Sequence, residues 1–147
     1  MDEKIKKSAK QIFELVGQAI FFAQLMEKEL AFLIMVPEII KNKKLPNSNR
    51  IYQEIKKLNK DTFGQLLKKL KNHATMNDAT QKILEEALKK RNLLAHDFFH
   101  SHQGKLEDIS KHKIMKDEIV EMRDLFKSIY DKLNQESRRN LRNSGLI

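Results

Sequence analysis

The chain has 147 residues and a net charge of +9, from 29 Lys and Arg against 20 Asp and Glu. It has no cysteine, which excludes disulfides and thiolate chemistry, and its four glycines and two prolines favour helix throughout. A positive excess of this size favours a polyanionic partner such as RNA, DNA or an acidic protein surface. A lysine-rich surface without such a partner would give the same composition.

The first predicted helix covers about residues 4–36. Its apolar residues recur at spacings of three, four and seven: Ile5, Ile12, Phe13, Val16, Ala19, Ile20, Ala23, Met26, Leu30, Leu33 and Ile34. Leu25 and Phe32 widen this surface, so we expect burial on more than one side, with part of the surface available to a partner chain. Glu27 lies on the apolar side, where it either pairs with a cation or reaches solvent at the edge. Pro37 is expected to bend or end the helix.

The same region bears on membranes and on the cellular compartment. The apolar stretch 19–36 is interrupted by four polar or charged residues, Gln24, Glu27, Lys28 and Glu29, so it is too broken to cross a bilayer. The charged N-terminal residues do not have the pattern of a signal peptide. We therefore expect a cytoplasmic protein without a membrane partner.

The middle of the chain predicts one short helix and the second of the four long helices. Residues 41–49 form a polar, basic loop, and a short helix follows over 51–58. Thr62 and Gln65 have capping-box spacing, which predicts a helix over about 63–72. Lys68, Lys69 and Lys71 lie opposite its leucines, either as a solvated face or as a track for a phosphate backbone.

Two further long helices complete the chain. One begins at a cap on Asn77 or Asp78 and runs to about Phe99, where residues 101–104 break it. The other covers about 113–134 and has a core seam spaced four, three, four, three and four: Met115, Ile119, Met122, Phe126, Ile129 and Leu133. Residues 135–147 are expected to be a frayed basic tail. The whole chain, 1–147, is thus predicted to be one all-α domain, an antiparallel four-helix bundle with a short additional helix.

Arg91 occupies an unusual position in the third long helix. Five apolar residues there share one stripe, and Arg91 falls in its middle, about 20° from Leu84. The stripe consists of Leu84, Ala87, Leu88, Ala95 and Phe98. A guanidinium is not deprotonated in proteins, so it needs an anionic partner or an opening in the packing; Glu27 is a candidate partner. Asn92 and His96 are four apart and are expected to share one face.

The segment Arg91 to His96 is Arg, four intervening residues and His, with a polar Asn directly after the Arg. In this form the chain resembles the HEPN superfamily (higher eukaryotes and prokaryotes nucleotide-binding), whose members are small all-α bundles with such a motif near the end of one helix. The length, the fold class and the place of the motif late in the third of four long helices extend the resemblance over nearly the whole chain.

The resemblance implies a metal-independent endoribonuclease of toxin or phage-defence type, acting as a homodimer in which two motifs form one site. Arg91 would grip the scissile phosphate, His96 would act as acid or base, and Asn92 would help orient them. Lys90 and His100 are the candidates for further contacts with substrate. Histidine titrates near neutrality and arginine binds phosphate oxygens bidentately, which suits cleavage that leaves 2′,3′-cyclic phosphate ends. No cofactor or metal is expected; RNA and an antitoxin protein are the expected partners.

One residue departs from a branch of the family in which an antitoxin nucleotidyltransferase modifies a tyrosine two residues after the His. Phe98 stands there and has no hydroxyl, so this mode of control is not expected.

Other interpretations of the motif remain open. Arg91 could be structural, paired to Glu27, and His96 could cap the helix C-terminus. His96, His100 and His102 with Asp97 could form a metal site, although only a loop places the third histidine. No interleaved aromatic and basic pattern indicates a stacking platform for single strands. The main functional alternative is a HEPN-like module that binds nucleotide, RNA or protein without cutting.

Overall fold

The computed structural model describes residues 2–58, 62–73 and 78–147, and no strand occurs in these ranges. The predicted all-α class is therefore confirmed for this part of the chain. Its elements, in order, are α1 (Glu3–Asn42), α2 (Ser48–Leu58), α3 (Phe63–His73), α4 (Asp78–Asn92), the π-helix η1 (Leu93–Asp97), α5 (Phe98–Ser101), the short 3-10 helices η2 (Lys105–Glu107) and η3 (Ile109–Lys111), and α6 (His112–Asn143).

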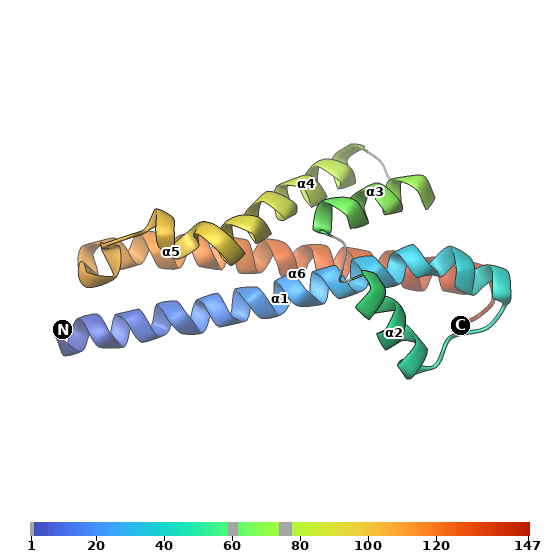
Figure 1. The fold of residues 1–147 in the computed structure, drawn as a ribbon, viewed down its shortest axis with the longest axis horizontal. Helices are drawn as coiled ribbons and strands as arrows, with labels where there is room; N and C mark the ends of the chain where they lie inside the picture. Colours follow the sequence, from blue (N-terminus) through green and yellow to red (C-terminus); the bar gives the residue numbers. More distant parts are fainter. Residues whose placement is uncertain (1, 59–61, 74–77) are drawn as a thin grey trace.

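The two longest helices, α1 and α6, lie side by side and run in the same direction (Figure 1). Three contacts fix this register: His112 Nδ1 with Ser8 Oγ, Lys116 with Gln11, and Arg123 with Gln18. Their sequence separations of 104, 105 and 105 are nearly constant, as parallel helices require. The predicted antiparallel arrangement is wrong for this pair.

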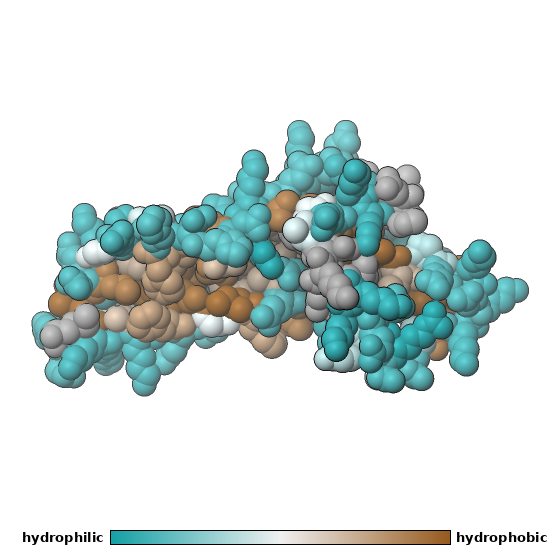
Figure 2. Space-filling model, viewed as in Figure 1, coloured by the Kyte–Doolittle hydropathy of each residue, from teal (hydrophilic) through white to brown (hydrophobic). Residues whose placement is uncertain are grey.

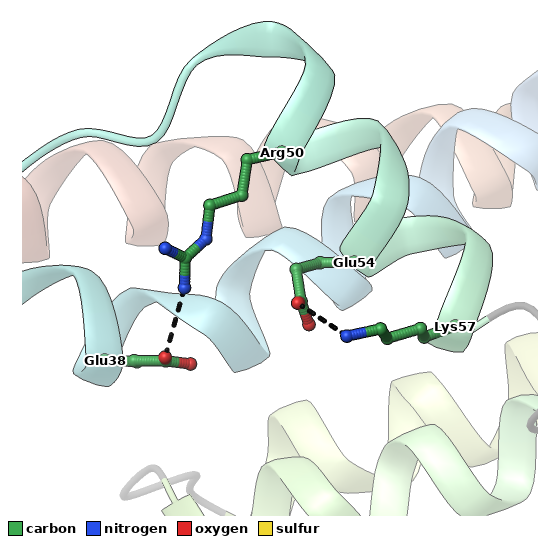
Figure 3. A network of polar contacts seen from close by, with 4 residues as sticks. All are labelled: Glu38, Arg50, Glu54 and Lys57. Atoms are coloured by element: carbon green, nitrogen blue, oxygen red, sulfur yellow. Dashed lines mark hydrogen bonds and ion pairs between the residues drawn. The ribbon is translucent and has the colours of Figure 1, made fainter.

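The direction of α6 follows from α2. The sequence pattern indicated only a short additional helix there, but α2 turns the chain back toward the middle of α1 (Figure 1). The helices α3, α4 and α6 then alternate in direction, so the first and last of five alternating helices run the same way. Arg50 ties α2 to α1 through an ion pair with Glu38 at 3.4 Å (Figure 3).

The core lies between α1 and α6 and is closed on one side by α3 and α4. Along α1 the buried residues recur every three or four positions: Ala9, Ile12, Val16, Ala19, Ala23, Met26, Leu30 and Leu33. The predicted α6 seam from Met115 to Leu133 is buried throughout, which confirms it. Leu66, Leu67 and Leu70 of α3 and Leu84 and Ala87 of α4 join the same core.

Two helix ends differ from the prediction. α1 continues through Pro37 to Asn42, because buried Val36 and Ile39 on either side of the proline keep this stretch packed despite the hydrogen bond that proline cannot donate. α6 continues to Asn143 instead of ending near Asn134, so the expected frayed tail is helical over most of its length. Ser137 and Leu141 extend the buried seam at spacings of four; the serine interrupts the apolar pattern and hid this extension.

The predicted start of α3 is confirmed by its cap. The Thr62 backbone N–H donates to Gln65 Oε1 at 2.7 Å, and the Gln65 N–H donates to Thr62 Oγ1 at 3.2 Å. α4 begins at Asp78, one of the two predicted caps; the other, Asn77, lies outside the described residues. Asn47 caps α2 by accepting from the Arg50 N–H, which shortens the predicted 41–49 loop.

Candidate functional site

Arg91 is held in place by two polar neighbours. Its Nε donates to Glu27 Oε1 at 2.5 Å, and its Nη1 donates to Asn92 Oδ1 at 3.3 Å. The hypothesis that Glu27 pairs with Arg91 is confirmed. A guanidinium has five N–H groups, so these two bonds leave three for another acceptor. The Arg91 side chain is 33% exposed and that of Glu27 21%, so the pair sits at the edge of the core.

The helix that carries Arg91 is not a uniform α-helix. Residues Leu93–Asp97 form a π-helical turn, and the helix then resumes through Ser101. Leu94 and Phe98 are buried while Ala95 is exposed. The predicted stripe is confirmed at Leu84, Ala87 and Phe98 and is wrong at Ala95, because Leu94 takes the buried place instead.

The π-turn also changes how Arg91 and His96 lie relative to each other. Five residues apart on an α-helix, they would point about 140° from one another. The wider turn, with its i→i+5 hydrogen bonds, lessens that angle. π-turns of this kind occur often at functional sites.

His96 is exposed and makes no hydrogen bond within the described part of the chain. The helical run continues past it to Ser101, so His96 is not at a helix C-terminus and the capping alternative loses its basis. Asn92 and His100 are also exposed, and Lys90 is partly buried. Among the described residues, Arg91 is thus held by Glu27 and Asn92, and His96, five positions further along the chain, has no hydrogen-bond partner.

An exposed apolar surface adjoins this segment. Phe13, Ile20 and Phe21 of α1 and Phe99 of α5 are between 39% and 55% exposed. The rings of Phe13 and Phe99 are in contact, with centroids 5.7 Å apart. Figure 2 shows hydrophobic side chains gathered over the half of α1 that is nearer its N-terminus. We call these four residues the apolar face.

Part of the apolar face was expected in the core. Phe13 and Ile20 were assigned to the buried stripe of α1, and that assignment is wrong. Each follows a fully buried residue, Ile12 or Ala19, by one position, which turns it about 100° away from the core. Gly17 lies in the same stretch, and a Cβ there would meet nothing within 4 Å.

Two further histidines, His102 and His112, have structural roles. His102 is buried, with Nε2 at 2.6 Å from Glu118 and Nδ1 at 3.4 Å from the Lys105 ammonium. Since an ammonium can only donate, Nδ1 accepts and Nε2–H donates to Glu118. His112 is also buried and joins Ser8 to the Leu106 carbonyl. These contacts close the connection between α5 and α6.

The metal alternative has no geometric support here. Its third candidate, His102, is buried and bound to Glu118, while His96 and His100 are exposed. Within the ranges the structure describes, no three His, Asp or Glu side chains are close enough to hold a metal ion. Sequence reasoning missed both buried histidines and the π-turn; the lone His112 at the start of α6 carried no pattern that could have revealed its role.

Comparison with protein-family models, with curated proteins and with solved structures found no match. None of the described helices is long and apolar enough to cross a membrane.

Proposed function

We propose that this chain is a HEPN-type endoribonuclease that cleaves RNA without a metal, through Arg91, Asn92 and His96. One observation carries the proposal. Arg91 is fixed by Glu27, keeps three N–H donors for an anion, and lies one turn from an exposed histidine that has no other partner among the described residues. In this proposal α1, α3, α4 and α6 are the four helices of the bundle and α2 is the additional one.

The chemistry follows from these two side chains. The 2′-hydroxyl oxygen of one nucleotide forms a bond to phosphorus while the bond from phosphorus to the next 5′-oxygen breaks. One imidazole takes the 2′-hydroxyl proton and a second gives a proton to the leaving oxygen. Arg91 balances the charge that develops on the phosphate oxygens, and its remaining N–H groups suit a bidentate contact. The products end in 2′,3′-cyclic phosphate and 5′-hydroxyl.

A homodimer supplies the second imidazole. Each copy offers a single exposed histidine in the motif, whereas the reaction uses an acid and a base. The apolar face lies beside the motif and offers the kind of exposed surface that marks an interface. A two-fold axis near it brings two copies of Arg91 and His96 around one phosphate. The setting we propose is a cytoplasmic toxin or defence system with an antitoxin protein.

The test is incubation of purified protein with RNA in excess chelator, followed by analysis of the product ends. Cleavage that survives chelation and leaves 2′,3′-cyclic phosphate is expected. His96→Ala should lower the rate 10²-fold or more, the usual scale of acid–base catalysis. His100→Ala, an exposed histidine four residues on, is the matched control and should act on substrate binding only. Full activity of the His96 variant, or cutting that requires metal, would contradict the proposal.

The second candidate is a binding module that grips RNA or nucleotide without cutting it. The Glu27–Arg91 ion pair supports it, because a cation held in this way can bind a phosphate without any further catalytic group. The two candidates differ in one result. A binding module would bind RNA, and Arg91→Ala would weaken that binding, but the bound RNA would remain intact after prolonged incubation at neutral pH.

A further inference from the structure

The end of the molecule where α1 and α6 finish carries most of its net charge. Because the two helices are parallel, their carboxyl ends lie at the same end, where α2 also lies (Figure 1). The segments 38–57 and 136–143 hold nine cations and three acids, so 9 − 3 gives +6 of the chain's +9. We call these two segments the basic end. Its cations are all exposed: Lys41, Lys43, Lys44, Arg50, Lys56, Lys57, Arg138, Arg139 and Arg142.

The acids of the basic end are already paired. Glu38 binds Arg50 at 3.4 Å and Glu54 binds Lys57 at 3.3 Å, as Figure 3 shows, and Glu136 binds Arg139 at 2.5 Å. Arg138 faces the half-buried Glu29. The other five cations, Lys41, Lys43, Lys44, Lys56 and Arg142, make no ion pair with any described residue.

The helix dipoles do not account for this excess. Each helix C-terminus carries about half a negative charge, so α1 and α6 together offset about one positive charge out of six. The remaining positive charges repel one another at the surface, and a bound polyanion would relieve this repulsion.

Tyr52 adds an aromatic ring to the basic end. It stands on α2 between Arg50 and Lys56 in sequence, and it is 61% exposed. The sequence pattern alone did not indicate a stacking platform, but the fold places this exposed ring on the same short helix as Arg50, Lys56 and Lys57, and the bases of a single strand stack on exposed rings near cations.

A pocket of about 280 Å³ lies in the same region, between α1 and the start of α2. Apolar side chains and polar or charged ones both line it, among them Met35, Ile39, Pro46, Lys44, Asn47 and Arg50. Arg50 reaches across from α2 to Glu38 on α1 (Figure 3). The pocket therefore gives the basic end a hollow with cations at its edge, which a flat solvated surface would not have.

We propose that the basic end binds the phosphate backbone of single-stranded RNA, with a base stacked on Tyr52, and so anchors the substrate of the proposed nuclease; the inference rests on that function. Glu38 in the basic end and Glu27 beside Arg91 are eleven residues apart on α1, or about 16 Å. At 3.4 Å per stacked nucleotide, about five nucleotides span this distance. A strand longer than this reaches both the anchor and the motif.

Binding is tested with a fluorescent 20-nucleotide RNA and the His96→Ala protein, so that cleavage does not interfere. Replacing Lys41, Lys44, Lys56 and Arg142 with Gln should lower the slope of log affinity against log salt by up to about 3, at about 0.7 for each phosphate that the protein no longer neutralises. The matched control replaces four exposed lysines elsewhere, Lys4, Lys7, Lys10 and Lys82, with Gln. The control should leave the slope nearly unchanged; an equal fall in both proteins would reduce the effect to net charge and overturn the proposal.

Tyr52 is tested separately. Tyr52→Ala should weaken binding about fivefold or more, the scale of removing one stacked base, whereas Tyr52→Phe keeps the ring and should bind nearly as the parent does. Equal affinity of both variants would remove Tyr52 from the interface.

Cleavage distinguishes this inference from the function on which it rests. In the active protein the four Gln substitutions should raise the KM for the 20-nucleotide RNA and leave kcat unchanged. A trinucleotide substrate, too short to reach the anchor, should show neither change. RNA that binds the basic end but is not cut would refute the nuclease and keep the anchor. Cutting of the long RNA with an unaltered KM would refute the anchor alone.

Discussion

Glu27 fixes the orientation of the Arg91 guanidinium. A free arginine side chain on a surface helix samples many rotamers, and ordering it on a phosphate costs conformational entropy at the moment of binding. The Glu27 contact on Nε fixes the guanidinium while leaving the Nη side with open donors. Since both side chains are mostly withdrawn from water, the pair is screened less than a surface ion pair would be.

Substitutions at this pair separate positioning from charge. Glu27→Gln keeps Arg91 charged but loosens it, so kcat should fall about 10- to 100-fold, the scale of a misplaced catalytic group. Arg91→Lys keeps a cation for Glu27 but loses the planar fork, and should lower kcat by about 10² or more. Both are measured on a defined RNA in chelator, with the free energy of unfolding measured in parallel. Wild-type kcat in Arg91→Lys would show that the guanidinium fork is not used.

A second prediction at the residue scale concerns Glu29 in the α1–α6 interface. Burial raises the pKa of Glu29 above its ordinary value of 4.5, although the side chains of Asn134 and Ser137 and the charge of Arg138 oppose the shift. The folded protein therefore binds a proton at Glu29 more readily than the unfolded chain does. The contribution of Glu29 to the free energy of unfolding therefore rises as pH falls through the raised pKa toward 4.5.

Glu29→Gln tests this sign. The variant should be more stable than the parent at pH 7, because burial disfavours the ionised carboxylate of the parent, and the difference should shrink as pH falls through the raised pKa of Glu29 toward 4.5. The free energy of unfolding in urea at both pH values provides the measurement. A variant less stable than the parent at pH 7 would mean that the ionised carboxylate stabilises the fold.

At the scale of elements, the sequence predicted the features that depend on hydrophobic periodicity and capping within one helix. It missed the features that depend on the geometry of a single turn. The α6 seam and the α3 cap followed from spacing and are confirmed, because burial and capping act within one helix. The Glu27–Arg91 pair could be proposed because a cation inside an apolar stripe requires an anion. The π-turn at 93–97 could not, since one extra residue in a turn leaves the composition and the nearby spacings unchanged. The direction of α6 was also missed. It depends on whether the short helix α2 runs back along α1 and so reverses the direction of every later helix.

The α3 cap gives a prediction of its own. Thr62→Ala removes the hydroxyl that accepts the Gln65 N–H, while the backbone N–H at position 62 can still donate to the Gln65 side chain. The free energy of unfolding should fall by about 1 kcal/mol, the usual cost of losing an N-cap. Thr62→Ser keeps the hydroxyl and should cost little. An unchanged midpoint of urea denaturation in the alanine variant would mean that α3 contributes little to the cooperative fold.

At the scale of the whole molecule, the two proposed surfaces lie toward opposite ends of the α1–α6 pair. The apolar face lies on the half of α1 nearer its start, the motif lies near the middle of α1, where Arg91 pairs with Glu27, and the basic end is where both long helices finish (Figure 1). This separation lets two copies meet at the apolar face while each basic end stays open to RNA. Their like charges are kept apart as well, which favours association.

The last prediction is that the protein is a two-fold homodimer joined through the apolar face. Phe13→Asp and Phe99→Asp place a charge on rings that would be buried between the copies, so each should shift the protein to monomer in sedimentation at micromolar concentration. Leu45→Asp is the control, because Leu45 is exposed to a similar degree but lies beyond the far end of α1. Mixing Arg91→Ala with His96→Ala protein then tests the shared site. The mixed dimer keeps one intact Arg91 and one intact His96 and is expected to regain part of the cleavage activity that each variant lacks alone. A wild-type protein that sediments as a monomer would rule out a site built from two copies.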